Sequence, residues 1–401
     1  MKLKTKLMLA AGALAASTAL TTAYAGEIRI GATMRMISEN GQKYGQMMQD
    51  EFDAINAAGG INGNTIKLTL LNDECKSDKG VANANKFAYQ ENVHLIIGST
   101  CSSVTLPIVD VTAQAEVPQI IPHSTNDQIT RKDSAWVFRV PISARYYKGV
   151  VAKYLNDNVG KKIAYVYASD AAAQSETQGI IGQMREVYGA EPIYEAQTQE
   201  KEIDFRSHLL KIKALNPDAI YFGGLQEPIA RFLVQSYEVG IPDTVVRAAS
   251  SAASNAPVPK LAGDAAKGVF FSAAYSDSDD RPIAKLFNAM VKARYGIQSV
   301  DHDFSQAYDL VRIVEIALKN AKLSTADADL KADRTAIRDA IANVKDYEGL
   351  ASGPISFCAD PTPECRDGNR TPVLIQYTKG GEDFEVGILD RVTMPIEFGL
   401  K

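Results

Sequence analysis

The sequence predicts an α/β protein with two lobes, each built on a mostly parallel sheet flanked by helices. Apolar stretches of strand length alternate with stretches of helical periodicity along almost the whole chain. The alternation runs as two successive series, separated by a strand-like exit at residues 136–141. With 401 residues, the chain is also too long for one hydrophobic core, so two domains are expected.

The first series alternates four strands with three helices, as in a parallel sheet covered on both faces. In its first helix, apolar residues such as Tyr44, Met48 and Phe52 recur at the spacing of one helix face. The glycines at residues 59–63 follow a helix and precede a strand, the reverse of a phosphate-binding loop, so they are interpreted as a helix end and a turn. The expected strands are residues 27–32, 66–70, 93–97 and 118–121, and the expected helices are residues 41–58, 81–89 and 102–115.

The second series has the same alternation and ends with a second strand-like exit at residues 268–274. We expect the three helices that follow to pack on the first sheet, and a C-terminal hairpin at residues 372–388 to pack on the second. Lobe 1 is therefore predicted as residues 26–140 plus 275–354, and lobe 2 as residues 141–274 plus 355–401. The expected strands are residues 162–168, 192–195, 219–222 and 245–249, and the expected helices are residues 174–188, 205–215, 228–239, 283–295, 305–318 and 335–344.

The N-terminus predicts export from the cytoplasm. Lys2, Lys4 and Lys6 precede an apolar stretch at residues 7–20, and Ala23-Tyr24-Ala25 forms a small-x-small cleavage signal. This pattern is typical of a secretory signal peptide, here residues 1–25, cleaved after Ala25. As a helix, the apolar stretch would reach only about 21 Å, short of a hydrocarbon core of roughly 30 Å. We expect the mature protein in the periplasm.

The charge of the mature chain excludes two classes of partner. Cleavage removes three lysines and no acidic residue, which moves the net charge from −5 to −8. A chain this acidic is a poor match for nucleic acid or for an anionic membrane surface. We expect a monomer that binds a small molecule.

The four cysteines predict two disulfides, because their number is even and the compartment is oxidising. Proximity in the sequence favours Cys75–Cys101 and Cys358–Cys365 over the two other pairings. A metal site is not expected, since the sequence has no Cys-x-x-Cys motif and its four histidines are scattered.

No catalytic motif stands out in the sequence. It contains no Gly-x-Ser-x-Gly elbow, no His-Glu-x-x-His motif and no Walker loop. We therefore expect neither an enzyme nor a cofactor.

Two polar turns are the candidate ligand-binding elements. Ser102 and Ser103 lie between a predicted strand and a predicted helix, at the carboxyl end of a parallel strand, where open α/β sheets bind ligands. Hydroxyls at a helix N-terminus suit a carboxylate, although Ser102 as a plain N-cap is an equal alternative. His123, Ser124 and Thr125 follow the next strand, and an ordinary capping turn is again the equal alternative.

An ordered set of short motifs carries a family resemblance over nearly the whole mature chain. It includes Asn-Ala-Ala-Gly-Gly-Ile-Asn-Gly at residues 56–63, Asn-Asp-Glu-Cys at 72–75, the serine turn at 98–103, Phe-Arg-Val at 138–140 and Tyr-Phe-Gly-Gly at 221–224. The set resembles the periplasmic leucine/isoleucine/valine-binding proteins. This resemblance implies a type I periplasmic binding fold, with two lobes joined by three crossovers, and a Cys75–Cys101 bridge. It also implies delivery of a small branched-chain or hydrophobic amino acid to an ABC permease in the inner membrane.

Carried over by position, the resemblance implies that the carboxylate of an amino acid meets Ser102 and Thr125. Ser103 would lie beside it, the backbone at His123 would contribute, and Tyr44 would line the cleft.

The second lobe departs from the family pattern. The family places an aromatic residue after the strand that ends near Ala168, and an acid for the ligand ammonium after the strand at residues 245–249. Here the first of these turns contains Asp170 among small residues and no aromatic residue. The second contains Ser251 and no acid. Because a buried ammonium needs a partner, two hypotheses stay open. Asp170 replaces the missing acid, or the ligand is a non-amino carboxylate, such as an aromatic acid, or a urea-like amide.

Overall fold

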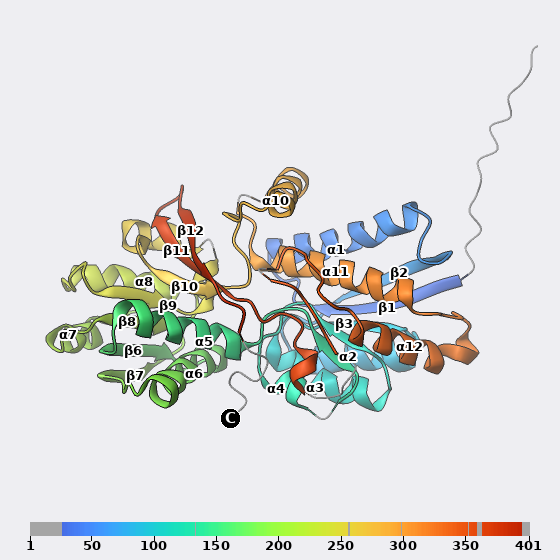
Figure 1. The fold of residues 1–401 in the computed structure, drawn as a ribbon, viewed down its shortest axis with the longest axis horizontal. Coiled ribbons are helices and arrows are strands. Elements are labelled where there is room, and N and C mark those ends of the chain that lie inside the picture. Colours follow the sequence, from blue (N-terminus) through green and yellow to red (C-terminus); the bar gives the residue numbers. More distant parts are fainter. Residues whose placement is uncertain are drawn as a thin grey trace, which may run out of the picture.

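The computed structural model describes residues 26–394, except residues 133, 256, 298, 352 and 359–362. The molecule is elongated, with one β-sheet in each half (Figure 1). The predicted signal peptide and its cleavage site lie outside the described residues. The α/β class with two mostly parallel sheets, expected from the alternating pattern, is confirmed. None of the helices among the described residues is long and apolar enough to cross a membrane.

The sheet of lobe 1 has the order β2-β1-β3-β4-β5, and all its neighbouring strands are parallel. Helices cover both faces, so that β3, with the sequence Leu-Ile-Ile-Gly, is buried throughout. The elements are β1 (Gly26–Met34), α1 (Glu39–Ala57), β2 (Asn64–Asn72), α2 (Ser77–Tyr89), β3 (Leu95–Gly98), α3 (Ser102–Gln114), β4 (Gln119–Ile121), α4 (Gln128–Arg131) and β5 (Val137–Arg139).

Three late helices return to lobe 1, as expected. They are α10 (Pro282–Tyr295), α11 (His302–Asn320) and α12 (Leu330–Ala342). Helices α11 and α12 lie in the same half of the molecule as β1, and α10 lies near the middle (Figure 1), with Phe287 in the same hydrophobic cluster as β1. Phe304 and Leu310 of α11 belong to one hydrophobic cluster with Ile30 of β1 and Phe52 of α1. The chain therefore leaves lobe 1 and comes back to complete its core.

The sheet of lobe 2 has the order β12-β11-β10-β9-β8-β6-β7. Its strands from β6 to β10 are parallel, while β11 and β12 form an antiparallel hairpin at the edge, as predicted for the C-terminal part. The elements are β6 (Ile163–Ala168), α6 (Ala171–Tyr188), β7 (Tyr194–Thr198), α7 (Arg206–Ala214), β8 (Ala219–Gly223), α8 (Gln226–Glu238), β9 (Val246–Ala249), the 3₁₀ turn η2 (Ser251–Ser254), α9 (Pro257–Ala262), β10 (Phe270–Ala273), β11 (Val373–Lys379) and β12 (Glu385–Arg391).

Two helices of lobe 2 were not predicted: the short α9, and a longer one that precedes β6. Helix α5 (Ala144–Tyr154) follows β5 directly and packs on α6. Its residues from Arg145 to Ala152 are all buried, polar and apolar alike, so its sequence lacks the single apolar stripe by which a surface helix is recognised.

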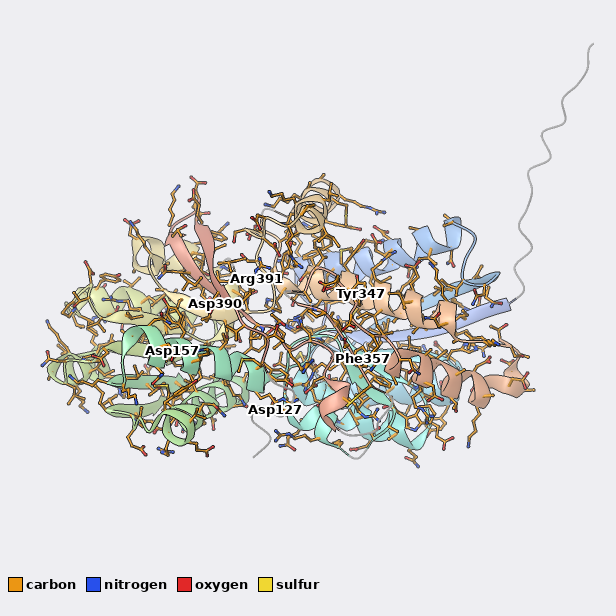
Figure 2. The ribbon with its side chains drawn as sticks, in the orientation of Figure 1. Asp127, Asp157, Tyr347, Phe357, Asp390 and Arg391 are labelled. Carbon is orange, nitrogen blue, oxygen red and sulfur yellow. A yellow bond between two sulfur atoms is a disulfide. The ribbon has the colours of Figure 1, made fainter. Side chains whose placement is uncertain are left out.

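Buried charges hold the chain where it passes between the lobes. Arg139, at the end of β5, and Arg145 of α5 both contact the buried carboxylate of Asp367, at 2.6 and 3.2 Å. Asp127 and Arg391 lie at the junction of the two halves (Figure 2), and they pair with Lys148 and Asp279, respectively. The lobe boundaries at residues 140, 275 and 355 stay predictions.

Both expected disulfides are present in the described part of the chain. Cys75 and Cys101 are bonded with their Cα atoms 5.6 Å apart, and Cys358 and Cys365 with theirs 5.1 Å apart. The pairing favoured by sequence proximity is confirmed.

Candidate ligand-binding site

A cavity of about 190 Å³ lies between the lobes, at the carboxyl ends of their parallel strands. We call it the interlobe cavity. Its volume is below the 300 Å³ or more that is typical of sites for drug-sized ligands, so it suits a small solute. Lobe 1 contributes His123, Thr125 and His302 to its lining, and lobe 2 contributes Tyr147, Ser251, Ala252, Ser254, Asn255 and Ala273.

On the lobe 1 side, the turn after β4 presents His123 and Thr125 to the cavity. Ser124, between them, is buried: its Oγ donates a 2.8 Å hydrogen bond to the carbonyl of Ser99 and lies 2.7 Å from Oγ1 of Thr105. The Ser124 side chain therefore joins the turns after β3 and β4, and it does not line the cavity.

Ser102 begins helix α3, and the backbone N–H of Asn126 donates to its Oγ at 3.3 Å. This contact brings the N-terminus of α3 beside the turn after β4. Ser103 is exposed, and neither serine is among the cavity-lining residues. Whether these serines hold a carboxylate stays a prediction.

Tyr44 of α1 lies nearby but is 4% exposed and outside the cavity lining. Its hydroxyl donates to the carbonyl of Arg35 at 3.3 Å, and its ring packs edge-on against Phe304. Burial raises the pKa of Tyr44, and the Asp303 carboxylate raises it further.

A cluster of titratable side chains forms part of the lobe 1 wall and extends behind it. Nδ1 of His123 lies 2.7 Å from Oδ1 of Asp303 and 3.1 Å from Oε1 of Gln306. The rings of His123 and His302 are stacked, with centroids 4.8 Å apart. The Asp303 carboxylate is therefore close to both imidazoles, since its Oδ1 also lies 3.5 Å from Nε2 of His302.

The two imidazoles have different electrostatic environments. Burial alone would lower the pKa of His123, but the carboxylate of Asp303 outweighs it and the pKa is raised. Burial lowers the pKa of His302 to about 4, so this ring is neutral near pH 7. Burial, followed by repulsion from Asp303, raises the pKa of Asp301 to about 7.

On the lobe 2 side, a buried acid positions the turn after β9. Glu176 of α6 accepts hydrogen bonds from the backbone N–H of Ser251 at 2.9 Å and from its hydroxyl at 2.8 Å. The hydroxyl of Tyr221 donates to the same carboxylate at 3.2 Å. Burial raises the pKa of Glu176. The turn that lacks an acid of its own thus receives one from a neighbouring helix.

Asp170 caps helix α6, because its Oδ1 accepts from the backbone N–H of Ala173 at 2.9 Å. Its Oδ2 is buried without a hydrogen-bond partner among the described residues, and the side chain does not line the cavity. Its suggested role toward a ligand ammonium stays a prediction.

Sequence reasoning missed six of the nine lining residues, Tyr147, Ala252, Ser254, Asn255, Ala273 and His302, and also Glu176, which binds Ser251 from behind the lining. Tyr147 lies on the unpredicted helix α5, and His302 begins α11 three residues before its predicted start. Glu176 did carry a signal, since it shares a helix face with Thr177, Ile180 and Met184, and a lone acid on an apolar face is rarely buried without a role.

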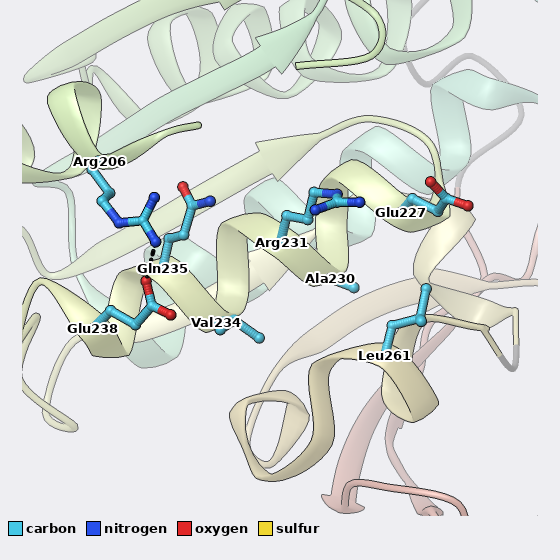
Figure 3. Close-up of a pocket in the computed structure, with 8 residues that line it drawn as sticks. All are labelled: Arg206, Glu227, Ala230, Arg231, Val234, Gln235, Glu238 and Leu261. Carbon is cyan, nitrogen blue, oxygen red and sulfur yellow. Dashed lines mark hydrogen bonds and ion pairs between the residues drawn. The ribbon is translucent and has the colours of Figure 1, made fainter. Parts of the chain in front are cut away.

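A larger hollow, of about 420 Å³, lies on lobe 2 against helix α8 (Figure 3). Charges of both signs line it, and Arg206 and Glu238 already pair within it at 2.6 Å. It is lined by helical residues of lobe 2 alone, so we do not regard it as the ligand site.

The fold and the interlobe cavity define a two-lobed solute-binding protein. The model of the periplasmic binding protein family matches residues 27–366, and the chain belongs to this family. Members of this family bind solutes and catalyse no reaction.

Two relatives have informative names. An "Amino acid binding protein" of Pseudomonas aeruginosa is 33% identical over 203 residues, which are 50% of this chain and 54% of that protein. The match therefore spans only about half the length of this relative. A "Leu/Ile/Val-binding protein homolog 1" of Brucella abortus is 28% identical over 251 residues, 61% of this chain and 67% of the relative.

Solved structures share the fold. The branched-chain amino acid transporter substrate-binding protein LivJ from Streptococcus pneumoniae, in complex with isoleucine, superposes with a TM-score of 0.73 at 24% identity, covering 90% of this chain and 99% of that one. A solute-binding protein of an ABC transporter from Rhodopseudomonas palustris, in complex with 3,4-dihydroxybenzoic acid, has a TM-score of 0.74 at 20% identity, covering 92% and 97%.

Proposed function

We propose that the protein is the substrate-binding component of an ABC transport system in the periplasm. It captures a small amino acid of the branched-chain or hydrophobic class in the interlobe cavity and, as a monomer, delivers it to an inner-membrane permease. The observation that carries this proposal is a small cavity shared by the carboxyl ends of two parallel sheets, with Thr125 on one side and Ser251 on the other. The names of the relatives support the ligand class.

The ligand's two ends would be bound by opposite lobes. The N-terminus of α3, at Ser102, and the hydroxyl of Thr125 suit a carboxylate, because free N–H groups and the helix dipole favour an anion there. In lobe 2, the candidates for an ammonium partner are Glu176, which binds the lining residue Ser251, and Asp170.

The test is mass spectrometry of the solute released from purified protein, followed by calorimetry with leucine, isoleucine and valine. Saturable 1:1 binding of at least one of them is expected. Absence of binding to every aliphatic amino acid would contradict the proposal.

A second candidate is a non-amino carboxylate. It is favoured by the cavity lining, in which the described residues contribute no carboxylate, and by the structural neighbour that holds an aromatic acid. Tighter binding of a benzoate than of any amino acid would select it.

A further inference from the structure

We propose that His123, His302 and Asp303 form a binding site for a divalent transition-metal ion in the lobe 1 wall of the interlobe cavity. One donor atom from each residue can be chosen such that all three lie within 4.8 Å of one another. Two imidazoles and one carboxylate suit Zn²⁺, Co²⁺ or Ni²⁺, whereas Mg²⁺ and Ca²⁺ prefer oxygen ligands alone. The set leaves coordination positions open for water or a solute.

The orientation of His302 fits ligation. Its Nδ1 lies 3.3 Å from Oγ of Ser254, while its Nε2 lies 3.5 Å from Oδ1 of Asp303. In protein metal sites, a ligating imidazole usually donates its other N–H to an oxygen, which sets the tautomer and the ring orientation. With its proton on Nδ1 and donated to Ser254 of lobe 2, the ring would present Nε2 to an ion shared with the Asp303 carboxylate.

The carboxylate has unused acceptor capacity. Oδ1 of Asp303 approaches Nδ1 of His123 to 2.7 Å, yet it is buried without a properly directed hydrogen bond among the described residues. A metal ion bonded at about 2.0–2.2 Å to each donor would use this capacity, after His123 and Asp303 move apart from 2.7 Å by roughly 0.7 Å to span a tetrahedral angle.

The proposed site is open to the interlobe cavity. Because His123 and His302 both line the interlobe cavity, the bound ion would be reached from it.

The test uses the full mature chain without a histidine tag, first stripped of metal with a chelator. Titration with Co²⁺ alone should give saturable 1:1 binding with visible absorption bands, and Zn²⁺ should displace the Co²⁺. His302→Ala and Asp303→Asn should each weaken binding by at least about tenfold. Circular dichroism and thermal melting will verify that the variants are folded.

The matched control is His208→Ala. His208 lies in lobe 2, with its Nδ1 2.7 Å from the Tyr194 hydroxyl, and this variant should bind Co²⁺ like the wild type. The proposal is overturned if wild-type protein shows no saturable 1:1 binding of Co²⁺ or Zn²⁺, or if folded His302→Ala binds as tightly as wild type. No amino acid is present in this experiment, so its outcome is independent of the proposed transport function.

Discussion

Glu176 is the residue through which lobe 2 shapes the interlobe cavity without lining it. Its carboxylate receives the N–H and the hydroxyl of Ser251, and Ser251 lines the cavity. A glutamine at this position places an N–H₂ group against one of these donors, so the turn after β9 should shift. We predict that Glu176→Gln weakens binding of the released solute by about tenfold, or about 1.4 kcal/mol.

Calorimetry with that solute is the measurement. If Glu176 acts through Ser251, the loss in the double variant with Ser251→Ala should be clearly smaller than the sum of the two single losses. The control is Glu195→Gln, since Glu195 pairs with Tyr167 and Gln178 instead. Full additivity would assign the two residues independent roles.

His94 should make stability depend on pH. It is fully buried, its Nδ1 accepts from the backbone N–H of Arg29 at 3.0 Å, and burial lowers its pKa to about 4. In the unfolded chain the imidazole takes up a proton near pH 6.5, whereas in the folded chain it does so only near pH 4. The free energy of unfolding contributed by His94 is therefore fully present above pH 6.5 and is lost as the pH falls toward 4. The contribution is on the order of 3 kcal/mol.

The measurement is urea unfolding of wild type and His94→Asn at several pH values between 4 and 7. We expect the wild type to lose free energy of unfolding more steeply with falling pH than the variant, whose amide oxygen can still accept from Arg29. Parallel slopes would show that His94 is not the group responsible.

At the scale of elements, the Cys75–Cys101 bridge ties the end of β2 to the start of α3. Cys101 is the N-cap of α3, and its carbonyl accepts from Val104 and Thr105. Removing this bridge should cost about 3.5 kcal/mol by the chain-entropy model for a separation of 26 residues, against about 2.3 kcal/mol for the separation of 7 in Cys358–Cys365.

The double variants Cys75→Ala/Cys101→Ala and Cys358→Ala/Cys365→Ala allow a direct comparison. Guanidinium unfolding should show the larger loss for the first, and hydrogen exchange should quicken at residues 102–105 only there. Since this segment lies beside the turn that carries Thr125, ligand affinity should also fall in the first variant alone. If the amides of α3 exchange equally slowly in both variants, the Cys75–Cys101 bridge does not hold the start of this helix.

The elements that sequence reasoning recovered are those with a clean period or a clear boundary. Helix α1 has one apolar face, and β3 is a short apolar run that ends at Gly98. Helix α5 was not predicted because tertiary packing buries its polar residues as well, so its sequence shows no single apolar face. The site was recovered only where it follows a strand end, as at His123, Thr125 and Ser251. Tyr147, Glu176 and His302 reach it from helices, by contacts between distant parts of the chain that no local pattern encodes.

For the whole molecule, the junction between the lobes combines a rigid part and a part that can separate. Arg139, Arg145 and Asp367 form a buried charge cluster where the chain crosses, and breaking such a cluster leaves an uncompensated buried charge. The contact of Ser254 with His302 across the cavity is a single 3.3 Å hydrogen bond. The first contact is therefore expected to persist and the second to break when the lobes move.

We predict that the lobes close around the ligand by rotating about these crossings. Closure excludes water from the interlobe cavity, which strengthens its few polar contacts, and the ligand stabilises the closed form only through its additional contacts there. Small-angle scattering should show a smaller radius of gyration and a narrower distance distribution at saturating ligand. Ser254→Ala removes one contact of the closed form and should weaken affinity modestly while leaving the scattering of the ligand-free protein unaltered. An identical distance distribution with and without ligand would instead indicate a cavity that is already closed and is entered by local opening.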